Sequence, residues 1–267
     1  MKKTLTIFII AIALAFTFVG CKKESGDLTK IKVGVSPVPH AEIVEALKDE
    51  FKAQGLDVKV VTFTDYVQPN IALAEGDLDL NYFQHEPYLK EFCASRNLDL
   101  ANIGAIHLEP MGFYAKNYKS VDEFKDGDEI VIPNDPSNGA RALRLLEDAG
   151  LIKLSDYNSE SITEKDIVEN PKNLKITAVD AATVAKAYED VAGGVINSNY
   201  ALGVGLNPKT DPIFVETTEG NPNANIIAAR TADKDNEAYK KFVQVLKSDK
   251  AKEFINEKYD GSVIPVE

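Results

Sequence analysis

The chain has 267 residues, of which 44% are hydrophobic and 27% charged, a globular composition long enough for one large domain or two lobes. This composition excludes a disordered, collagen-like or multi-span membrane protein. Lys and Arg number 30 against 42 Asp and Glu, which gives a formal net charge of −12, and no segment gathers five or six basic residues. The sequence therefore predicts no nucleic-acid partner.

The N-terminus has the order of an export signal. Two lysines precede an uncharged, mostly apolar run that ends at Gly20, and this run is short for a membrane-spanning helix. We predict a signal peptide over residues 1–20, with a single-pass anchor as the alternative. The ending Phe18-Val19-Gly20-Cys21 resembles the bacterial lipobox, in which the cysteine becomes the lipidated first residue of the exported protein.

The cysteine count agrees with lipidation of Cys21. Cys93 is the only other cysteine, so a lipid on Cys21 leaves no partner for an intrachain disulfide. A Cys21–Cys93 bridge is the alternative. The polar residues 21–30 are expected to form a tether between the bilayer and the folded body, and the sequence does not distinguish the inner from the outer membrane.

From Ile31 onward, strand patterns alternate with helix patterns, which is typical of parallel sheets with crossover helices. In the first unit we expect strands at residues 31–35, 58–63 and 78–83 and helices at 39–54, 67–74 and 86–96. After an extended stretch over 103–114 the pattern restarts, with strands at 129–132, 174–179 and 194–197 and helices at 138–149 and 181–189. Two strands, 213–216 and 225–229, and a helix pair over 236–258 complete the chain.

The predicted fold is α/β with two lobes, each a mostly parallel sheet flanked by helices. The terminal helix pair has no sheet of its own, so it should pack back on the first unit. The chain would then cross between the lobes twice. We expect lobe I to contain residues 31–108 plus 206–267 and lobe II residues 109–205.

Ligands of open α/β sheets bind beyond the carboxyl ends of the strands, so the residues that follow each strand are the candidates for a binding site. Tyr66, Phe83, His85 and Tyr88 place rings at two such ends, where they would line a largely apolar pocket. About half of these rings could instead belong to the core, because neighbours on a strand such as Tyr82 and Phe83 point to opposite faces.

The helix at 138–149 carries two arginines that face different ways. Arg144 lies opposite the apolar stripe and is expected to be solvated, whereas Arg141 lies beside it in the first turn. A guanidinium there could receive a carboxylate in a two-pronged contact. Asn138 is expected to cap this helix.

Asn197 and Asn199 follow the strand at 194–197. Their amide oxygens could accept hydrogen bonds from an ammonium group without adding a charge. For Asn199, a turn or capping role is an equal alternative.

No catalytic or nucleotide-binding motif accompanies these residues. The sequence lacks G-x-S-x-G, a P-loop, H-E-x-x-H and C-x-x-C. The three histidines, at 40, 85 and 107, are few and dispersed for a transition-metal site, although distant residues can converge in a fold. We therefore expect no enzyme activity, no cofactor and no metal.

Several long motifs resemble the methionine-binding lipoproteins of ABC importers, the NlpA/MetQ family. They are Thr64-Asp65-Tyr66, Asn81-Tyr82-Phe83-Gln84-His85-Glu86-Pro87-Tyr88-Leu89, Ile132-Pro133-Asn134-Asp135 with residues 138–141, and Val195-Ile196-Asn197-Ser198-Asn199-Tyr200. The resemblance implies a two-lobed, lipid-anchored periplasmic-binding-protein fold. It also implies a receptor that closes on L-methionine or a related compound and delivers it to the membrane subunits of an importer.

The same resemblance implies residue roles. The pocket rings of the family match Tyr66, Phe83, His85 and Tyr88, and its carboxylate-binding arginine matches Arg141. Its polar contacts match Asn197 and Asn225, with a contact role for Asn199 as well. Asn225 is indicated by the resemblance alone.

Other functions are compatible with the sequence. The receptor could take D-methionine, a methionyl dipeptide or another amino acid. A metal-delivery lipoprotein and a surface adhesin on the same fold are the alternatives from other classes.

Overall fold

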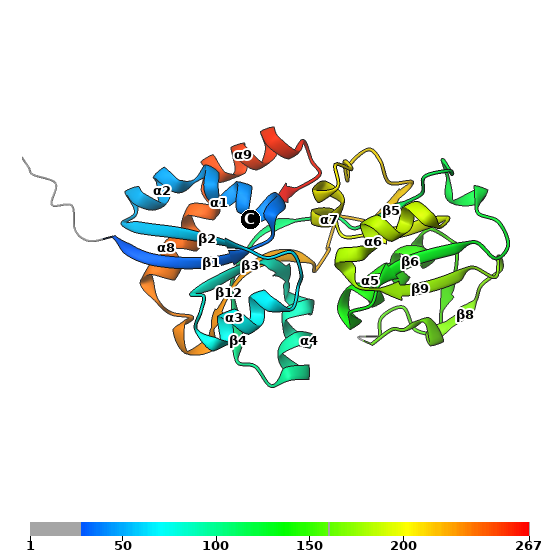
Figure 1. The fold of residues 1–267 in the computed structure, drawn as a ribbon, viewed down its shortest axis with the longest axis horizontal. Coiled ribbons are helices and arrows are strands. Elements are labelled where there is room, and N and C mark those ends of the chain that lie inside the picture. Colours follow the sequence, from blue (N-terminus) through cyan, green and yellow to red (C-terminus); the bar gives the residue numbers. More distant parts are fainter. Residues whose placement is uncertain (1–27, 160, 267) are drawn as a thin grey trace, which may run out of the picture.

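The computed structural model describes residues 28–159 and 161–266 (Figure 1). The predicted signal peptide, the lipidation site Cys21 and most of the tether lie outside these residues. Across the described ranges, none of the helices combines the length and apolar character that crossing a bilayer requires. Two lobes lie side by side, each built on one sheet. The two-lobed α/β fold predicted from the sequence is confirmed.

The sheet of lobe I has the strand order β13-β4-β12-β3-β1-β2. Its strands are β1 (Thr29–Val35), β2 (Leu56–Thr62), β3 (Leu80–His85), β4 (Leu100–Leu108), β12 (Ala224–Arg230) and β13 (Ile264–Pro265). β1 pairs in parallel with β2 and β3, whereas β12 is antiparallel to β3 and β4, and β13 is antiparallel to β4. Strands β1 to β4 therefore run in one direction, and their carboxyl ends share one edge.

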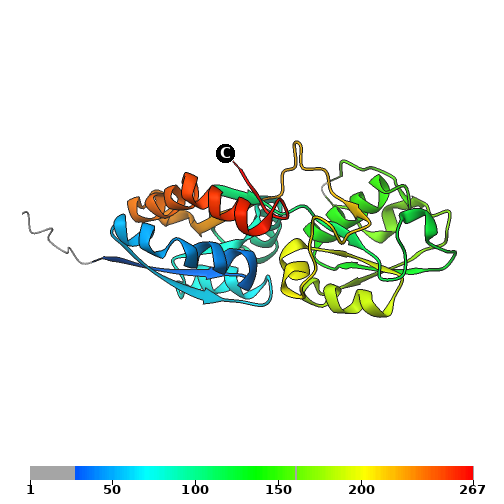
Figure 2. The same cartoon turned by 90° about the horizontal axis from the view of Figure 1, so that it is seen from above.

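Helices cover both faces of this sheet (Figure 2). One face packs against α1 (Glu42–Ala46), α2 (Lys48–Ala53), α8 (Glu237–Leu246) and α9 (Asp249–Tyr259), and the other against α3 (Gln68–Glu75) and α4 (Glu86–Arg96). The single helix predicted over 39–54 is wrong. A short turn η1 (Pro37–Ala41) comes first, and the helix is interrupted at Leu47. The apolar spacing continues through this break, so periodicity could not reveal it.

The sheet of lobe II has the strand order β11-β5-β10-β6-β9. Its strands are β5 (Gly112–Tyr114), β6 (Glu129–Pro133), β9 (Lys175–Val179), β10 (Gly193–Ile196) and β11 (Phe214–Val215). One face packs against α5 (Pro136–Asp148), and the other against α6 (Ala181–Ala187) and α7 (Ser198–Gly203). A hairpin of β7 (Lys153–Leu154) and β8 (Ile167–Glu169) was not predicted.

Short helical turns complete the chain. They are η2 (Val121–Glu123), η3 (Glu164–Asp166), η4 (Tyr188–Asp190) and η5 (Thr231–Asp233).

The chain passes from the first sheet to the second over residues 109–111 and returns over residues 216–223. A return at residue 206 is too early, because Phe214 pairs with Phe113 and Val215 with Gly112 at the edge of the second sheet. This pairing satisfies backbone groups that an open edge would leave unpaired. The predicted tether is also too long, since Thr29 and Lys30 already pair with β2.

Candidate functional site

A narrow pocket lies between the lobes. Its walls include all eight residues that the sequence predicts as ligand-binding: Tyr66, Phe83, His85, Tyr88, Arg141, Asn197, Asn199 and Asn225. The fold thus brings together strand ends of lobe I, the second turn of α5, the start of α7 and the start of β12. The sequence had placed Arg141 in the first turn, because it expected the helix to begin at residue 138. The binding roles of these residues stay predictions.

The apolar wall consists of three rings from lobe I. The centroid of the Tyr66 ring lies 5.9 Å from that of Phe83 and 5.8 Å from that of Tyr88. The Tyr88 hydroxyl donates to the carbonyl of Tyr66 at 2.9 Å, which fixes the loop after β2 against α4. Tyr82 points to the opposite face of β3 and is fully buried there, as the alternation of a strand requires. The rings form a surface on which a flexible apolar chain can lie.

Helix α5 begins differently from the prediction. Asp135, not Asn138, is the N-cap, and its carboxylate accepts from the backbone N–H of Asn138 at 2.8 Å. Pro136 then occupies the first helical position, where no N–H donor is needed. Gly139 lets the first turn approach β6, because a Cβ there would lie 2.9 Å from the carbonyl oxygen of Pro133. Asn138 is thereby free to turn its amide toward the pocket.

A chain of hydrogen bonds fixes the direction of each polar group around Asn138. The Tyr88 backbone N–H donates to Nδ1 of His85, so the proton of this imidazole is on Nε2, which donates to Oδ1 of Asn138 at 3.1 Å. Asn138 Nδ2 donates to the Asp135 carboxylate, and Asn197 Nδ2 donates to Asn138 Oδ1 at 2.9 Å. Asn197 Oδ1 remains buried without a hydrogen-bond partner among the described residues. It is an acceptor that a bound N–H group could satisfy.

His85 is a neutral hydrogen-bond donor in this chain. Burial, and then the nearby charge of Arg141, lower the pKa of His85 to about 3. The imidazole therefore carries no charge at neutral pH, and the positive charge at this side of the pocket belongs to Arg141.

Arg141 lies on the pocket side of α5 as predicted, but two of the three nitrogens of its guanidinium already donate hydrogen bonds within the protein. Nε and Nη2 donate to the two carboxylate oxygens of Glu216 at 2.8 and 2.5 Å, and Nη2 also donates to the backbone carbonyl of Glu109 at 2.9 Å. Burial opposes ionisation of Glu216, yet the Arg141 charge and hydrogen bonds hold the pKa of this carboxyl below its usual value. The two-pronged contact predicted for a ligand is therefore made with Glu216. Nη1 makes no hydrogen bond within the described part of the chain.

The prediction for Arg144 needs correction as well. This side chain points away from the pocket but is half-buried rather than solvated. Its Nε donates to the carbonyl of Tyr157 at 2.9 Å and its Nη2 to that of Ser159 at 2.6 Å. Arg144 thus fastens the loop after β7 to α5, a contact between residues that are too far apart in sequence for helix phasing to anticipate.

Polar contacts across the pocket join the two lobes. The hydroxyl of Tyr66 in lobe I donates to Oδ1 of Asn199 in lobe II at 2.5 Å. The Tyr200 hydroxyl donates to the carbonyl of Thr64 at 3.2 Å, and the rings of Tyr66 and Tyr200 lie 4.9 Å apart. Asn199 is therefore not the cap of α7, because Asn197 holds that position. These contacts belong to a closed arrangement of the lobes.

The sequence did not single out Glu109 as a pocket residue. It directly follows β4, at the first crossing between the lobes, and its side chain is buried in the pocket wall. Because ligands of α/β sheets bind beyond the carboxyl ends of strands, the position of Glu109 directly after β4 would have indicated it. Because residues 103–114 were interpreted as one extended stretch, the end of β4 was hidden.

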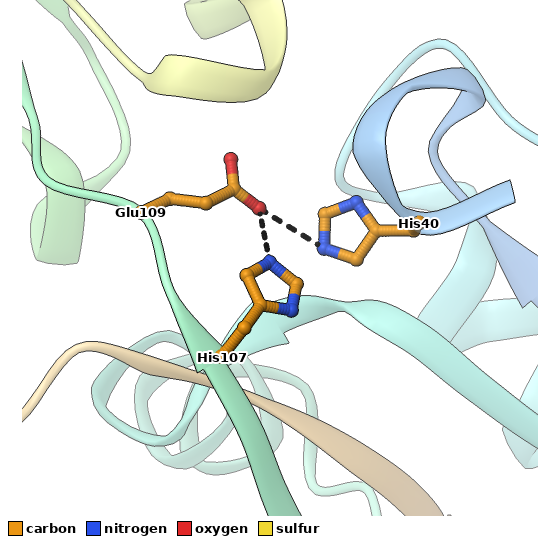
Figure 3. A group of neighbouring side chains, drawn as sticks. All are labelled: His40, His107 and Glu109. Atoms are coloured by element: carbon orange, nitrogen blue, oxygen red, sulfur yellow. Dashed lines mark hydrogen bonds and ion pairs between the residues drawn. The ribbon is translucent and has the colours of Figure 1, made fainter. Parts of the chain in front are cut away.

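Glu109 meets two of the three histidines (Figure 3). Its Oε1 lies 2.7 Å from Nε2 of His107 and 3.3 Å from Nε2 of His40. His40 and His107 therefore converge despite their separation in sequence. Side chains of these types are donors for transition metals, so the three together could hold an ion. Figure 3 also shows that one carboxylate oxygen already serves both imidazoles.

Neighbouring residues orient the two histidines. The Tyr82 hydroxyl is hydrogen-bonded to Nδ1 of His107, and Nε2 of His40 lies 2.9 Å from Oδ1 of Asn225. Burial lowers the pKa of His40 to about 4 and that of His107 to about 3, so both are neutral at pH 7. The oxygen of Asn225 is thus engaged by His40, and its Nδ2 amino group makes no hydrogen bond to the described residues.

Cys93 lies in α4 and is half-buried, and burial raises the pKa of its thiol. The alternative Cys21–Cys93 disulfide involves a residue outside the described ranges and remains a prediction.

Comparisons with known proteins agree with the family resemblance of the sequence motifs. The family model of the NlpA lipoproteins matches residues 31–267. A methionine-binding lipoprotein MetQ of Bacillus subtilis is 43% identical over 275 residues, which cover 100% of this chain and 99% of that protein. A D-methionine-binding lipoprotein MetQ of Escherichia coli is 42% identical and covers 95% of this chain and 94% of its own length. A nutrient binding protein of Burkholderia cenocepacia, solved bound to methionine, superposes with a TM-score of 0.86 at 42% identity, covering 89% of this chain and 100% of that one.

Proposed function

The chain belongs to the NlpA lipoprotein family, and on that premise we propose that it is a solute-binding receptor of an ABC importer that closes on methionine. Lipid on Cys21 would hold the exported protein at a membrane, and the membrane subunits of the importer would receive the solute. Two of the relatives reported above are named as binding lipoproteins and the third as a nutrient binding protein. We propose a binding protein rather than an enzyme here too.

The observation that carries the proposal is the composition of the pocket. Three aromatic rings face a set of polar groups at the interface of two lobes, as a thioether side chain on a zwitterionic head requires. Each contact between sulfur and an aromatic ring contributes about 0.3–1.5 kcal/mol. The Arg141 Nη1 and Asn225 Nδ2 groups are donors suited to a carboxylate, and Asn197 Oδ1 is an acceptor suited to an ammonium.

Thermal unfolding of the purified protein, stripped of bound solute, tests this function. Methionine at about 100 times its Kd should add about 2.7 kcal/mol of stability, which raises the Tm by roughly 5–10 °C for a chain of this size. L-methionine, D-methionine, methionyl dipeptides and zinc would be compared. A shift with none of the methionine compounds, on protein shown by intact mass to be unliganded, would disprove the receptor function.

A further inference from the structure

Glu109 is the only acidic side chain among the described residues that line the pocket, and it is 6% exposed. Its carboxylate accepts from Nε2 of His107, lies 3.3 Å from Nε2 of His40, and receives the backbone N–H of Asn199 at the start of α7. A carboxylate has about four acceptor positions. The hydrogen bonds within the protein therefore leave room for one more donor.

No permanently charged partner is paired with this carboxylate within the described part of the chain. The Arg141 guanidinium is engaged by Glu216 through both carboxylate oxygens. The two histidines are neutral at pH 7 because burial lowers their pKa values. Burial without a counter-ion raises the pKa of Glu109, because the charged form of the carboxyl is unfavourable in the pocket wall. A ligand that brings a cation would stabilise this charged form.

We propose that Glu109 forms the cation subsite of the pocket and receives the primary ammonium group of the solute. This inference rests on the proposed function and adds the residue that selects for a charged amino group. Asn197 Oδ1, a buried oxygen without a partner among the described residues, supplies a neutral acceptor for the same end of the ligand. The carboxylate end then lies toward Arg141 Nη1 and Asn225 Nδ2.

A divalent metal ion is the competing occupant of His40, His107 and Glu109. A metal ion would have to take Nε2 of both imidazoles, which are engaged by Asn225 Oδ1 and by Glu109 Oε1 within the protein. Binding of an ion would break both of these contacts. An ammonium brings one charge and matches Glu109.

The test removes the ammonium from the ligand and the charge from the protein, separately and together. The ligands are L-methionine and 4-(methylthio)butanoate, which lacks the amino group. The proteins are the wild type, Glu109→Gln and, as a matched control, Glu91→Gln, which changes a half-buried acid on α4 outside the pocket. Affinities are measured by isothermal titration calorimetry, and elemental analysis of each protein reports bound metal.

The wild type and Glu91→Gln should prefer methionine over the des-amino analogue by about 100-fold or more, because truncating one partner of a buried charge pair costs 30-fold to several thousand-fold. In Glu109→Gln this preference should fall to about tenfold or less. The analogue should bind Glu109→Gln at least as well as it binds the wild type, since the uncompensated carboxylate is gone.

Two results would overturn the inference alone: an unchanged preference in Glu109→Gln, or stoichiometric metal on the wild type. If Glu109→Gln does not fold, a crystal structure of the wild type with L-methionine decides, because the ligand nitrogen must lie within about 3.2 Å of a Glu109 carboxylate oxygen. A separation above about 4 Å would refute the subsite. Failure of the wild type to bind any methionine compound would overturn the proposed function, and this inference with it.

Discussion

The buried pair of Arg141 and Glu216 has two separable roles, in stability and in binding. The two side chains are 7% and 15% exposed, and Glu216 lies on the return crossing between the lobes. Arg141→Met removes three hydrogen bonds and leaves the Glu216 carboxylate with the backbone N–H of Met111 and the more distant Asn223 amide. The variant thus contains a buried charge without its counter-ion.

The expected cost of Arg141→Met is roughly 3–5 kcal/mol of unfolding free energy, the usual range for breaking one partner of a buried ion pair. This corresponds to a fall in Tm of roughly 10 °C for a chain of this length. The double variant Arg141→Met with Glu216→Gln has no orphaned charge. It should recover about 2–4 kcal/mol of the loss, because replacing both partners of a buried pair is often nearly neutral.

Binding should not recover with stability. Nη1 of Arg141 is absent from both variants, so both should bind methionine 30-fold to several thousand-fold more weakly than the wild type. Glu216→Gln alone should lower stability and retain binding, because it frees the guanidinium. The assays are urea unfolding and isothermal titration calorimetry on the single and double variants.

Arg144→Met is the control. It loses the hydrogen bonds to the carbonyls of Tyr157 and Ser159, which should cost about 1 kcal/mol, and it should bind methionine as the wild type does. A double variant as unstable as Arg141→Met would refute the ion-pair argument. Unchanged binding by Arg141→Met would show that the ligand is not held through this arginine.

Three further predictions concern closure, pH and the anchor. Tyr66→Phe removes the hydroxyl that joins the lobes through Asn199. Calorimetry should therefore show about 5- to 10-fold weaker methionine binding. Equal affinity would mean that this contact does not stabilise the closed state. Burial holds the pKa of His40 at about 4 and those of His85 and His107 at about 3. The unfolded chain, with histidine pKa values near 6.5, therefore binds more protons, and stability should fall from pH 6.5 toward pH 4 by up to about 1.4 kcal/mol per pH unit for each histidine. The raised pKa of Glu109 opposes part of this fall in stability. Urea unfolding that shows constant or rising stability toward acid would contradict the predicted fall. Cys21→Ala should abolish labelling of the exported protein with palmitate, and a labelled variant would disprove the lipidation site.

The local sequence pattern was sufficient to predict most helices and strands and the residues on one side of the pocket. The predicted helix 86–96 has the bounds of α4, since His85 caps it, Pro87 is tolerated in its first turn, and Asn97 ends it in the left-handed conformation. The rule that ligands bind at strand ends led to Tyr66, Phe83, His85 and Tyr88. Each of these inferences depends on residues that are close in sequence, where periodicity and capping are decisive.

Asn225 was indicated by family resemblance and not by its own surroundings. Its place beside His40, 185 positions away in the chain, follows from the antiparallel insertion of β12 between β3 and β4. A late strand returning to the first sheet leaves little local signal. The sequence thus determined the class of fold and the class of ligand, whereas it did not determine the full set of contacts in the pocket.

Only the tertiary structure decided how the charges are paired. Helix phase placed Arg141 beside the pocket, but the partner that occupies its fork, Glu216, is 75 residues distant and arrives on the return crossing. Glu109 and the two buried histidines likewise meet through the packing of η1 against the sheet. An ion pair or hydrogen bond forms only between groups that the fold brings within about 3 Å of each other. The donors and acceptors can therefore be identified from the sequence, but their pairing depends on how distant strands cross.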